Sequence, residues 1–162
     1  MQTRTLGKDG PQVSVVCFGA YPIGGGMGTV PEEQAIAALQ AALDVGMTFI
    51  DTAESYRTSE SIIGRAIRGR RHEAFLATKL THSHSPDHMS QAIEKSLKAL
   101  DTDYVDLYQL HSPQPEWPIE QTMEHLLRLR DAGKIRYIGI SHFSGEETLQ
   151  ALQYAPIQSS QP

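Results

Sequence analysis

The chain has 162 residues, of which 40% are hydrophobic and 20% are charged, and its formal net charge is −5 at pH 7. This composition is typical of a soluble globular chain, and the acidic balance argues against nucleic acid as a partner. No apolar run approaches a membrane span, Met1–Arg4 lacks the apolar core of a signal peptide, and the single Cys17 permits no internal disulfide. We therefore expect one cytoplasmic domain over residues 1–162, without a membrane partner.

The first predicted element is a short β-hairpin. Arg4–Leu6 and Val13–Ser14 flank the turn-rich stretch Gly7–Pro11. Val15–Phe18 follows as a continuous apolar run, which predicts a strand buried on both faces. Cys17 lies in this run and is expected to be a small buried hydrophobe.

A helix and four further strand–helix units follow. Thr29–Glu32 has a capping-box pattern and predicts a helix that Gly46 ends. The units have strands predicted at Thr48–Ile50, Ala74–Thr78, Val105–Leu110 and Arg136–Ile140, with helices predicted from Ser59 to Ile67, after Ser85, after Pro118 and after Ser144. In the last helix a second capping box is predicted, with Leu149 and Leu152 facing inward, and Pro156–Gln161 predicts the beginning of a sixth strand.

Alternating apolar strands and amphipathic helices predict a parallel sheet with right-handed crossovers. An open dinucleotide-binding sheet needs its glycine fingerprint in the first strand-to-helix turn. Gly24–Gly26 lies several residues past the first strand and is separated from the next helix, so it does not fit that spacing. The early hairpin and the functional groups on several strand ends favour an α/β fold of the parallel (β/α)8 TIM-barrel type, incomplete at its C-terminal end.

Four ionisable residues follow or end the central strands. Asp51 and Tyr56 come after the strand at 48–50, Lys79 after the next strand, and His111 after the strand at 105–110. A lysine ammonium lowers the pKa of a nearby tyrosine, a carboxylate keeps that buried lysine charged, and a neutral histidine can orient a carbonyl group. This set is a general acid with supports and no nucleophile, which suits carbonyl reduction with hydride supplied by a cofactor.

Each of these residues also has a structural interpretation. A tyrosine after a strand is more often a packing residue, an Asp–Lys pair is more often a structural ion pair, and a lone histidine more often a satisfied loop residue. Their shared position at one end of consecutive parallel strands is what favours the functional interpretation.

The sequence resembles the aldo-keto reductase family along its whole length. The matching motifs are Asp51–Tyr56, Ala77–Lys79, Leu107–His111 and Gly139–Phe143, together with Leu6–Gly7, Phe18–Gly19 and Ile157–Pro162. The resemblance implies an eight-stranded barrel that uses NADPH, with NADH as the alternative, to reduce a small aldehyde or ketone.

The resemblance also implies roles for particular residues. Tyr56 is the proton donor, Lys79 and Asp51 tune it, and His111 orients the substrate carbonyl. Ser141, His142 and Gln161 hold the nicotinamide carboxamide, and Asp51 lies near the nicotinamide ribose.

Two features depart from the family pattern. The family commonly has asparagine at the position of His142, and a histidine cannot mimic a whole amide. Only six strands are predicted before Pro162, so we expect open barrel edges that favour self-association. We also expect the isolated chain to reduce substrate poorly unless a second copy covers those edges.

Other interpretations stay open. His82, His84 and nearby His88 suggest a metal-dependent barrel hydrolase, although a solvated polar loop accounts for them more simply. The fold also occurs in cofactor-sensing regulatory subunits of membrane channels, so it does not by itself establish turnover. Trp117 either stacks on the substrate or anchors its loop, and the arginines at 68, 70 and 71 suggest a solvated turn on the opposite face.

Overall fold

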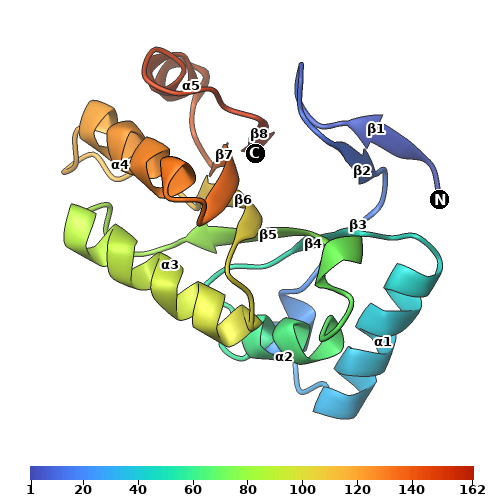
Figure 1. The fold of residues 1–162 in the computed structure, drawn as a ribbon. Coiled ribbons are helices and arrows are strands. Elements are labelled where there is room, and N and C mark those ends of the chain that lie inside the picture. The colour runs from blue at the N-terminus through green and yellow to red at the C-terminus, as the bar shows by residue number, and fades with distance from the viewer.

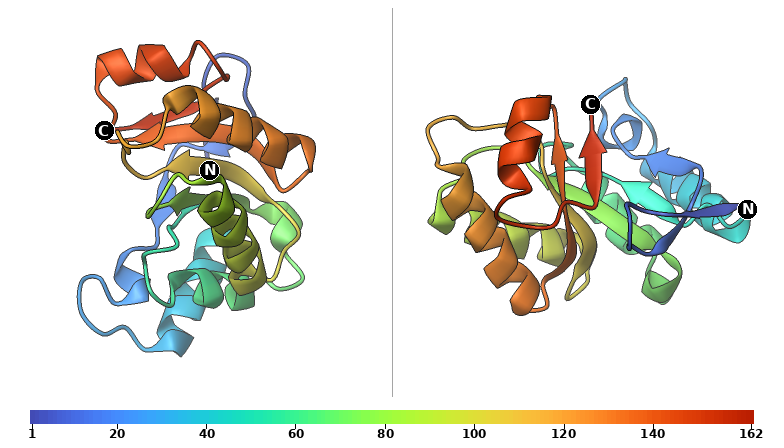
Figure 2. Two further views of the ribbon diagram at one scale, coloured as in Figure 1. Left: turned by 90° about the vertical axis from the view of Figure 1, so that its left-hand side faces the viewer. Right: turned by 90° about the horizontal axis from the view of Figure 1, so that it is seen from above.

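The computed structural model describes all 162 residues as a curled parallel sheet with helices along one side (Figure 1). The sheet has six strands in the order of the sequence, namely β3 (Cys17–Gly19), β4 (Phe49–Asp51), β5 (Phe75–Leu80), β6 (Val105–Leu110), β7 (Ile135–Ser141) and β8 (Ser159–Gln161). Every strand pairs in parallel with the next one. The predicted parallel arrangement of the strands is therefore confirmed. Figure 2 shows how the sheet curls.

The helices connect successive strands, as the sequence pattern predicts. They are α1 (Glu32–Asp44), α2 (Ser59–Ala66), α3 (Pro86–Leu100), α4 (Ile119–Asp131) and α5 (Gly145–Ala151), with two short 3-10 helices, η1 (Pro22–Gly24) and η2 (Arg71–Glu73). The predicted hairpin is present as antiparallel β1 (Thr3–Thr5) and β2 (Gln12–Ser14). No helix combines the length and the apolar character that crossing a membrane requires.

The core lies between the sheet and the helices. All residues of β5 and β6 are buried, because these central strands have a strand on either side and side chains against both faces. The apolar stripe of α3, including Met89 and Ile93, is fully buried against them. This packing fixes the central strands, and therefore fixes where their carboxyl ends lie.

Side-chain caps open two of the helices, and one of the two predicted capping boxes is present. The Ser85 hydroxyl accepts a hydrogen bond from the backbone N–H of His88 at 3.3 Å and opens α3. Ser144 and Glu147 form a reciprocal capping box at the start of α5. The capping box predicted at Thr29–Glu32 is wrong, because Pro31 occupies the N-cap of α1 and has no side-chain oxygen to accept a hydrogen bond.

The prediction that Val15–Phe18 forms a strand buried on both faces is wrong. The strand begins two residues later, Val15 and Val16 are 49% and 46% exposed, and Cys17 is exposed. The reason is tertiary: β3 is an outer strand of the sheet with a single neighbour, β4, so its apolar side chains are not covered on both sides.

The prediction for the last helix is also wrong in part. Leu149 and Leu152 are 67% and 47% exposed instead of facing inward. Ala151, at the end of α5, and Ala155, just after it, are the buried residues of this segment, and α5 packs against α4. The α5 leucines lie on a flank that no other element covers.

Ion pairs to the buried Asp106 carboxylate tie the strands together away from their carboxyl ends. Asp106 accepts hydrogen bonds from Arg71 at 2.8 Å and from Arg136 at 3.0 Å, and both guanidinium groups lie about 4 Å from the ring centre of Tyr104. Arg70 pairs with two exposed or half-exposed carboxylates. The expected solvated arginine turn is therefore correct for Arg68 but wrong for Arg71, whose side chain is only 17% exposed.

Candidate active site

Four of the predicted site residues converge at the carboxyl ends of β4, β5 and β6. Asp51 is the last residue of β4, Lys79 lies near the end of β5, and His111 follows β6 directly. The loop after β4 carries Tyr56. Because parallel strands bring their carboxyl ends to one edge, side chains far apart in the sequence meet there.

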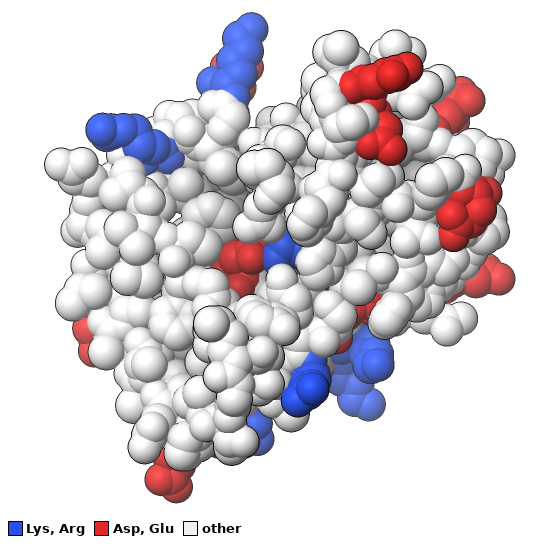
Figure 3. All heavy atoms as spheres, turned by 180° about the vertical axis from the view of Figure 1, so that it is seen from behind, with Lys and Arg blue, Asp and Glu red and all other residues white.

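Lys79 and Asp51 form an ion pair that is almost completely buried. Lys79 Nζ lies 2.5 Å from Asp51 Oδ2, and the side chains are 1% and 13% exposed. The same ammonium donates a hydrogen bond to the carbonyl oxygen of Thr52 at 2.9 Å. In Figure 3, acidic and basic atoms lie side by side near the middle of an otherwise largely uncharged face. These partners replace the water that a buried ammonium loses.

Gln109, which is not among the predicted site residues, also contacts this pair. Its amide Nε2 donates a hydrogen bond to Asp51 Oδ1 at 3.1 Å, and the residue is 2% exposed. A signal was available, because a polar residue inside an apolar strand and two positions before His111 projects to the same face as that histidine.

The Tyr56 ring lies over the ion pair. Its centre is 5.3 Å from Lys79 Nζ, 5.0 Å from the ring centre of Tyr21 and 5.8 Å from that of His111. The backbone here leaves no space for a side chain at Gly24, whose Cβ would lie 2.1 Å from the carbonyl oxygen of Tyr56. A glycine at position 24 therefore allows the loop to approach this closely.

The pKa of Tyr56 is raised, chiefly by burial and secondly by the negative charge of Asp51. The predicted lowering of this pKa by Lys79 is therefore wrong for the free chain. The physical reason is burial, which disfavours the charged phenolate, followed by the negative charge of the nearby Asp51 carboxylate.

His111 is held by a neighbouring hydroxyl. Its Nδ1 lies 2.9 Å from Thr81 Oγ1, and its backbone N–H donates to the Leu80 carbonyl oxygen. Burial, followed by the positive charge of Lys79, lowers the pKa of His111. The imidazole is therefore neutral at pH 7, as the sequence analysis expects.

The three residues expected to hold the nicotinamide lie at the carboxyl ends of β7 and β8. Ser141 is 1% exposed and pairs in register with Gln161, whose carbonyl oxygen accepts a hydrogen bond from the His142 N–H at 2.9 Å. His142 has φ of +58°, in the left-handed region where asparagine is also favoured. All three residues therefore lie at the edge of the sheet that carries the ion pair.

The ring of His142 is oriented by the protein. Its Nδ1 lies 2.9 Å from the carbonyl oxygen of His111, which can only accept, so Nδ1 carries the hydrogen. In the neutral ring Nε2 is then a bare acceptor, able to receive an N–H from a carboxamide. The donor and acceptor set at this edge thus fits one end of a nicotinamide amide.

His82, His84 and His88 do not form a metal centre. No grouping of three or more histidine, cysteine, aspartate or glutamate side chains is arranged to hold a metal ion. His84 is 3% exposed, and burial lowers its pKa to about 4, so the expected solvated loop is wrong for this residue. His88 Nε2 lies 3.9 Å from Glu54.

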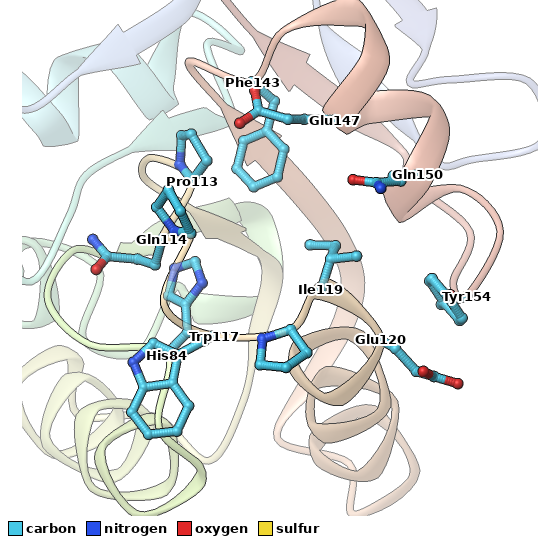
Figure 4. Close-up of a pocket in the computed structure, with 12 residues that line it drawn as sticks. His84, Pro113, Gln114, Trp117, Ile119, Glu120, Phe143, Glu147, Gln150 and Tyr154 are labelled. Carbon is cyan, nitrogen blue, oxygen red and sulfur yellow. The ribbon is translucent and has the colours of Figure 1, made fainter.

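Trp117 lies away from the four converging residues. Together with His84, Phe143 and the start of α4 it lines a separate cavity of about 420 Å³, and none of the four residues lines it (Figure 4). This position favours the interpretation of Trp117 as a loop anchor over substrate stacking.

Comparisons with known proteins identify the family of this chain and its fold. Residues 15–162 match the model of the aldo/keto reductase family. The chain is 41% identical to aldo-keto reductase YhdN of Bacillus subtilis, covering 100% of this chain and 53% of the relative. It is 37% identical to aldo-keto reductase yakc [NADP(+)] of Schizosaccharomyces pombe, covering 98% of this chain and 51% of that protein.

A solved structure of a thermostable aldo-keto reductase in complex with the inhibitor epalrestat superposes with a TM-score of 0.91 at 36% identity, over 99% of this chain and 61% of its own. This similarity confirms the predicted TIM-barrel type. A probable voltage-gated potassium channel subunit beta of Arabidopsis thaliana is 35% identical over 93% of this chain and 49% of its own length. The chain spans about half the length of the curated relatives it matches. On the strength of its motifs, its fold and these matches, the chain belongs to the aldo/keto reductase family, whose members are oxidoreductases.

Proposed function

We propose that this chain carries the carbonyl-reducing site of an NADPH-dependent aldo-keto reductase that converts a small aldehyde or ketone into an alcohol. The observation that supports it most is the buried Lys79–Asp51 pair, with the rings of Tyr56 and His111 beside it. The cluster contains an acid and its supports but no activated nucleophile, which suits proton transfer to a carbonyl oxygen.

In this proposal Tyr56 donates the proton. The raised pKa keeps its phenol protonated at neutral pH, so the acid is in the required form before reaction. When the proton leaves, the phenolate forms 5.3 Å from the ammonium of Lys79, measured from the ring centre. Lys79 attracts that phenolate, whereas burial and the Asp51 carboxylate disfavour it, and Asp51 holds the ammonium in place.

His111 orients the carbonyl group through Nε2. A neutral imidazole donates from Nε2 only when Nδ1 accepts, so the Thr81 hydroxyl must donate to Nδ1. In this structure Thr81 Oγ1 donates its one proton to Ser55 Oγ at 3.0 Å, so the hydroxyl has to rotate before it can donate to Nδ1. The direction of the Thr81 hydroxyl therefore decides whether His111 donates or accepts.

The cofactor, when bound, supplies the hydride. We propose that Ser141, His142 and Gln161 hold its carboxamide, with His142 Nε2 accepting an N–H, and that Asp51 lies near the nicotinamide ribose. NADPH is favoured because the name of the yeast relative specifies NADP(+), and NADH is the alternative.

Aldehyde-dependent oxidation of NADPH by the purified chain tests the proposal. A reactive aromatic aldehyde serves as substrate, Tyr56→Phe removes only the acidic hydroxyl, and Tyr154→Phe, outside the cluster, is the matched control. Turnover that survives in Tyr154→Phe and disappears in Tyr56→Phe supports the assignment. Equal rates in both variants would contradict it.

The similarity to a potassium channel β subunit supports a second candidate, a cofactor-sensing regulatory subunit. Equilibrium binding of NADPH and its consumption separate the two functions. A chain that binds NADPH but does not oxidise it with any aldehyde favours regulation.

We also propose that the outer strands β3 and β8 support self-association, because each has a single hydrogen-bonded neighbour in the sheet. Light scattering across a range of protein concentrations tests this. A mass that stays monomeric at every concentration would contradict it.

A further inference from the structure

Gln109 occupies the middle of an in-register row that crosses four strands. It pairs with Lys79 of β5 on one side and with Gly139 of β7 on the other, and Gly139 pairs with Ser159 of β8. Residues in register on neighbouring strands project to the same face of a sheet. Since Gln109 is 2% exposed, its amide must find hydrogen-bond partners inside the protein.

Both ends of the Gln109 amide have such a partner. Nε2 donates to Asp51 Oδ1 at 3.1 Å, and Oε1 accepts from Ser159 Oγ at 3.2 Å. A carboxylate oxygen can only accept, so the nitrogen end has to face Asp51. The Ser159 hydroxyl then fixes the opposite end, which leaves the amide one orientation.

Gly139 provides the space for this bridge. A Cβ at position 139 would lie 2.8 Å from Gln109 Cγ and 3.1 Å from Oε1. With a glycine on β7, the side chain of β6 passes over that strand and reaches Ser159 on β8. The sequence thus combines the long side chain of Gln109 on β6 with a glycine, Gly139, at the paired position on β7.

We infer that Gln109 is a positioning residue for the proposed carbonyl-reducing site, acting through Asp51. The two oxygens of Asp51 have separate partners, Lys79 at Oδ2 and Gln109 at Oδ1, and together these fix the rotation of the carboxylate. Asp51 in turn holds the ammonium that lies beside the Tyr56 ring. The inference rests on the proposed function, but the contact itself can be tested without turnover.

The first test is a double-mutant cycle on urea unfolding of the full chain, without cofactor. Gln109→Met keeps the length of the side chain and removes its amide. It is expected to lower the urea midpoint of the wild type, and to change that of the Asp51→Ala variant little, because the partner is already absent. Equal shifts in both backgrounds would overturn the inference, whether or not the chain is an enzyme.

Ser159→Ala provides a second variant in case Gln109→Met does not fold. It removes the hydroxyl that fixes the amide and leaves the donor to Asp51 in place. A smaller midpoint shift is expected, again confined to the background that retains Asp51. A shift of the same size in Asp51→Ala would count against the inference.

The second test is kinetic. Gln109→Met is expected to lower kcat about tenfold and leave the aldehyde KM within about twofold, because a misplaced ammonium affects the reacting state more than substrate binding. The same substitution should cause no further loss in Asp51→Ala. Gln91→Met, exposed on α3, is the matched control and should not change kcat. If Gln109→Met lowers kcat by the same factor with and without Asp51, the positioning role is overturned. A rise in KM without a fall in kcat would overturn it as well. A wild-type chain without turnover would match the expectation of a poorly active isolated chain, and the unfolding cycle would then decide the contact.

Discussion

Lys79 Nζ lies 2.5 Å from Asp51 Oδ2, with the lysine side chain 1% exposed and the aspartate side chain 13% exposed. This unequal burial predicts unequal costs when one partner is removed. Asp51→Ala strands a buried ammonium and is expected to lower the free energy of unfolding by about 3 kcal/mol. Lys79→Met is expected to lower the free energy of unfolding by less, because the remaining Asp51 carboxylate is better solvated and still accepts the hydrogen bond from the Gln109 amide. Urea unfolding of the two variants checks the order, and a larger loss for Lys79→Met would contradict it.

The titration of Tyr56 should be displaced to high pH. Burial and the Asp51 charge raise its pKa, so the phenol persists above pH values of about 10, where an ordinary tyrosine ionises. The phenolate absorbance of the wild type minus that of Tyr56→Phe isolates this group. In Asp51→Asn the midpoint is expected to fall, because the negative charge that opposes the phenolate is gone. A wild-type midpoint below that of free tyrosine would refute this account of the site.

The Thr81 hydroxyl should control which nitrogen of His111 carries the hydrogen. Thr81→Val removes the group at 2.9 Å from Nδ1 and is expected to lower kcat/KM about tenfold or more, since a positioned hydrogen-bond donor to a developing oxyanion contributes about 10²–10³-fold. Ser55→Ala removes the competing acceptor and should preserve or raise kcat/KM. Nitrogen NMR shifts of the His111 ring report the tautomer directly. An unchanged tautomer in Thr81→Val would show that another group sets it.

Asp106 should matter for stability and not for the proposed chemistry. Its side chain is 5% exposed and accepts from Arg71, Arg136 and the Leu76 N–H. Asp106→Ala leaves the buried Leu76 N–H without its acceptor and removes the partner of both guanidinium groups, and is expected to lower the free energy of unfolding by about 1–3 kcal/mol. Asp103→Ala, at an exposed position nearby, should change it by about 0.5 kcal/mol or less. Similar midpoints for the two variants in urea would contradict the structural role.

Much of the fold could be predicted because local rules and tertiary packing agree. The limits of β6 match the prediction at both ends, and the caps at Ser85 and Ser144 follow from side-chain chemistry within a few residues. The grouping of Asp51, Tyr56, Lys79 and His111 also followed, since parallel strands necessarily bring their carboxyl ends to one edge.

The sequence by itself determined the alternation of strands and helices, and with it the edge of the sheet where ionisable groups collect. The tertiary structure alone decided which apolar residues are covered, since Val15 and Leu149 have the same chemistry as core residues but lie where no neighbour packs. It also decided the electrostatics of Tyr56 and the part played by Gln109. Both depend on distances of a few ångströms between strands that are far apart in the chain, and no local pattern encodes such distances.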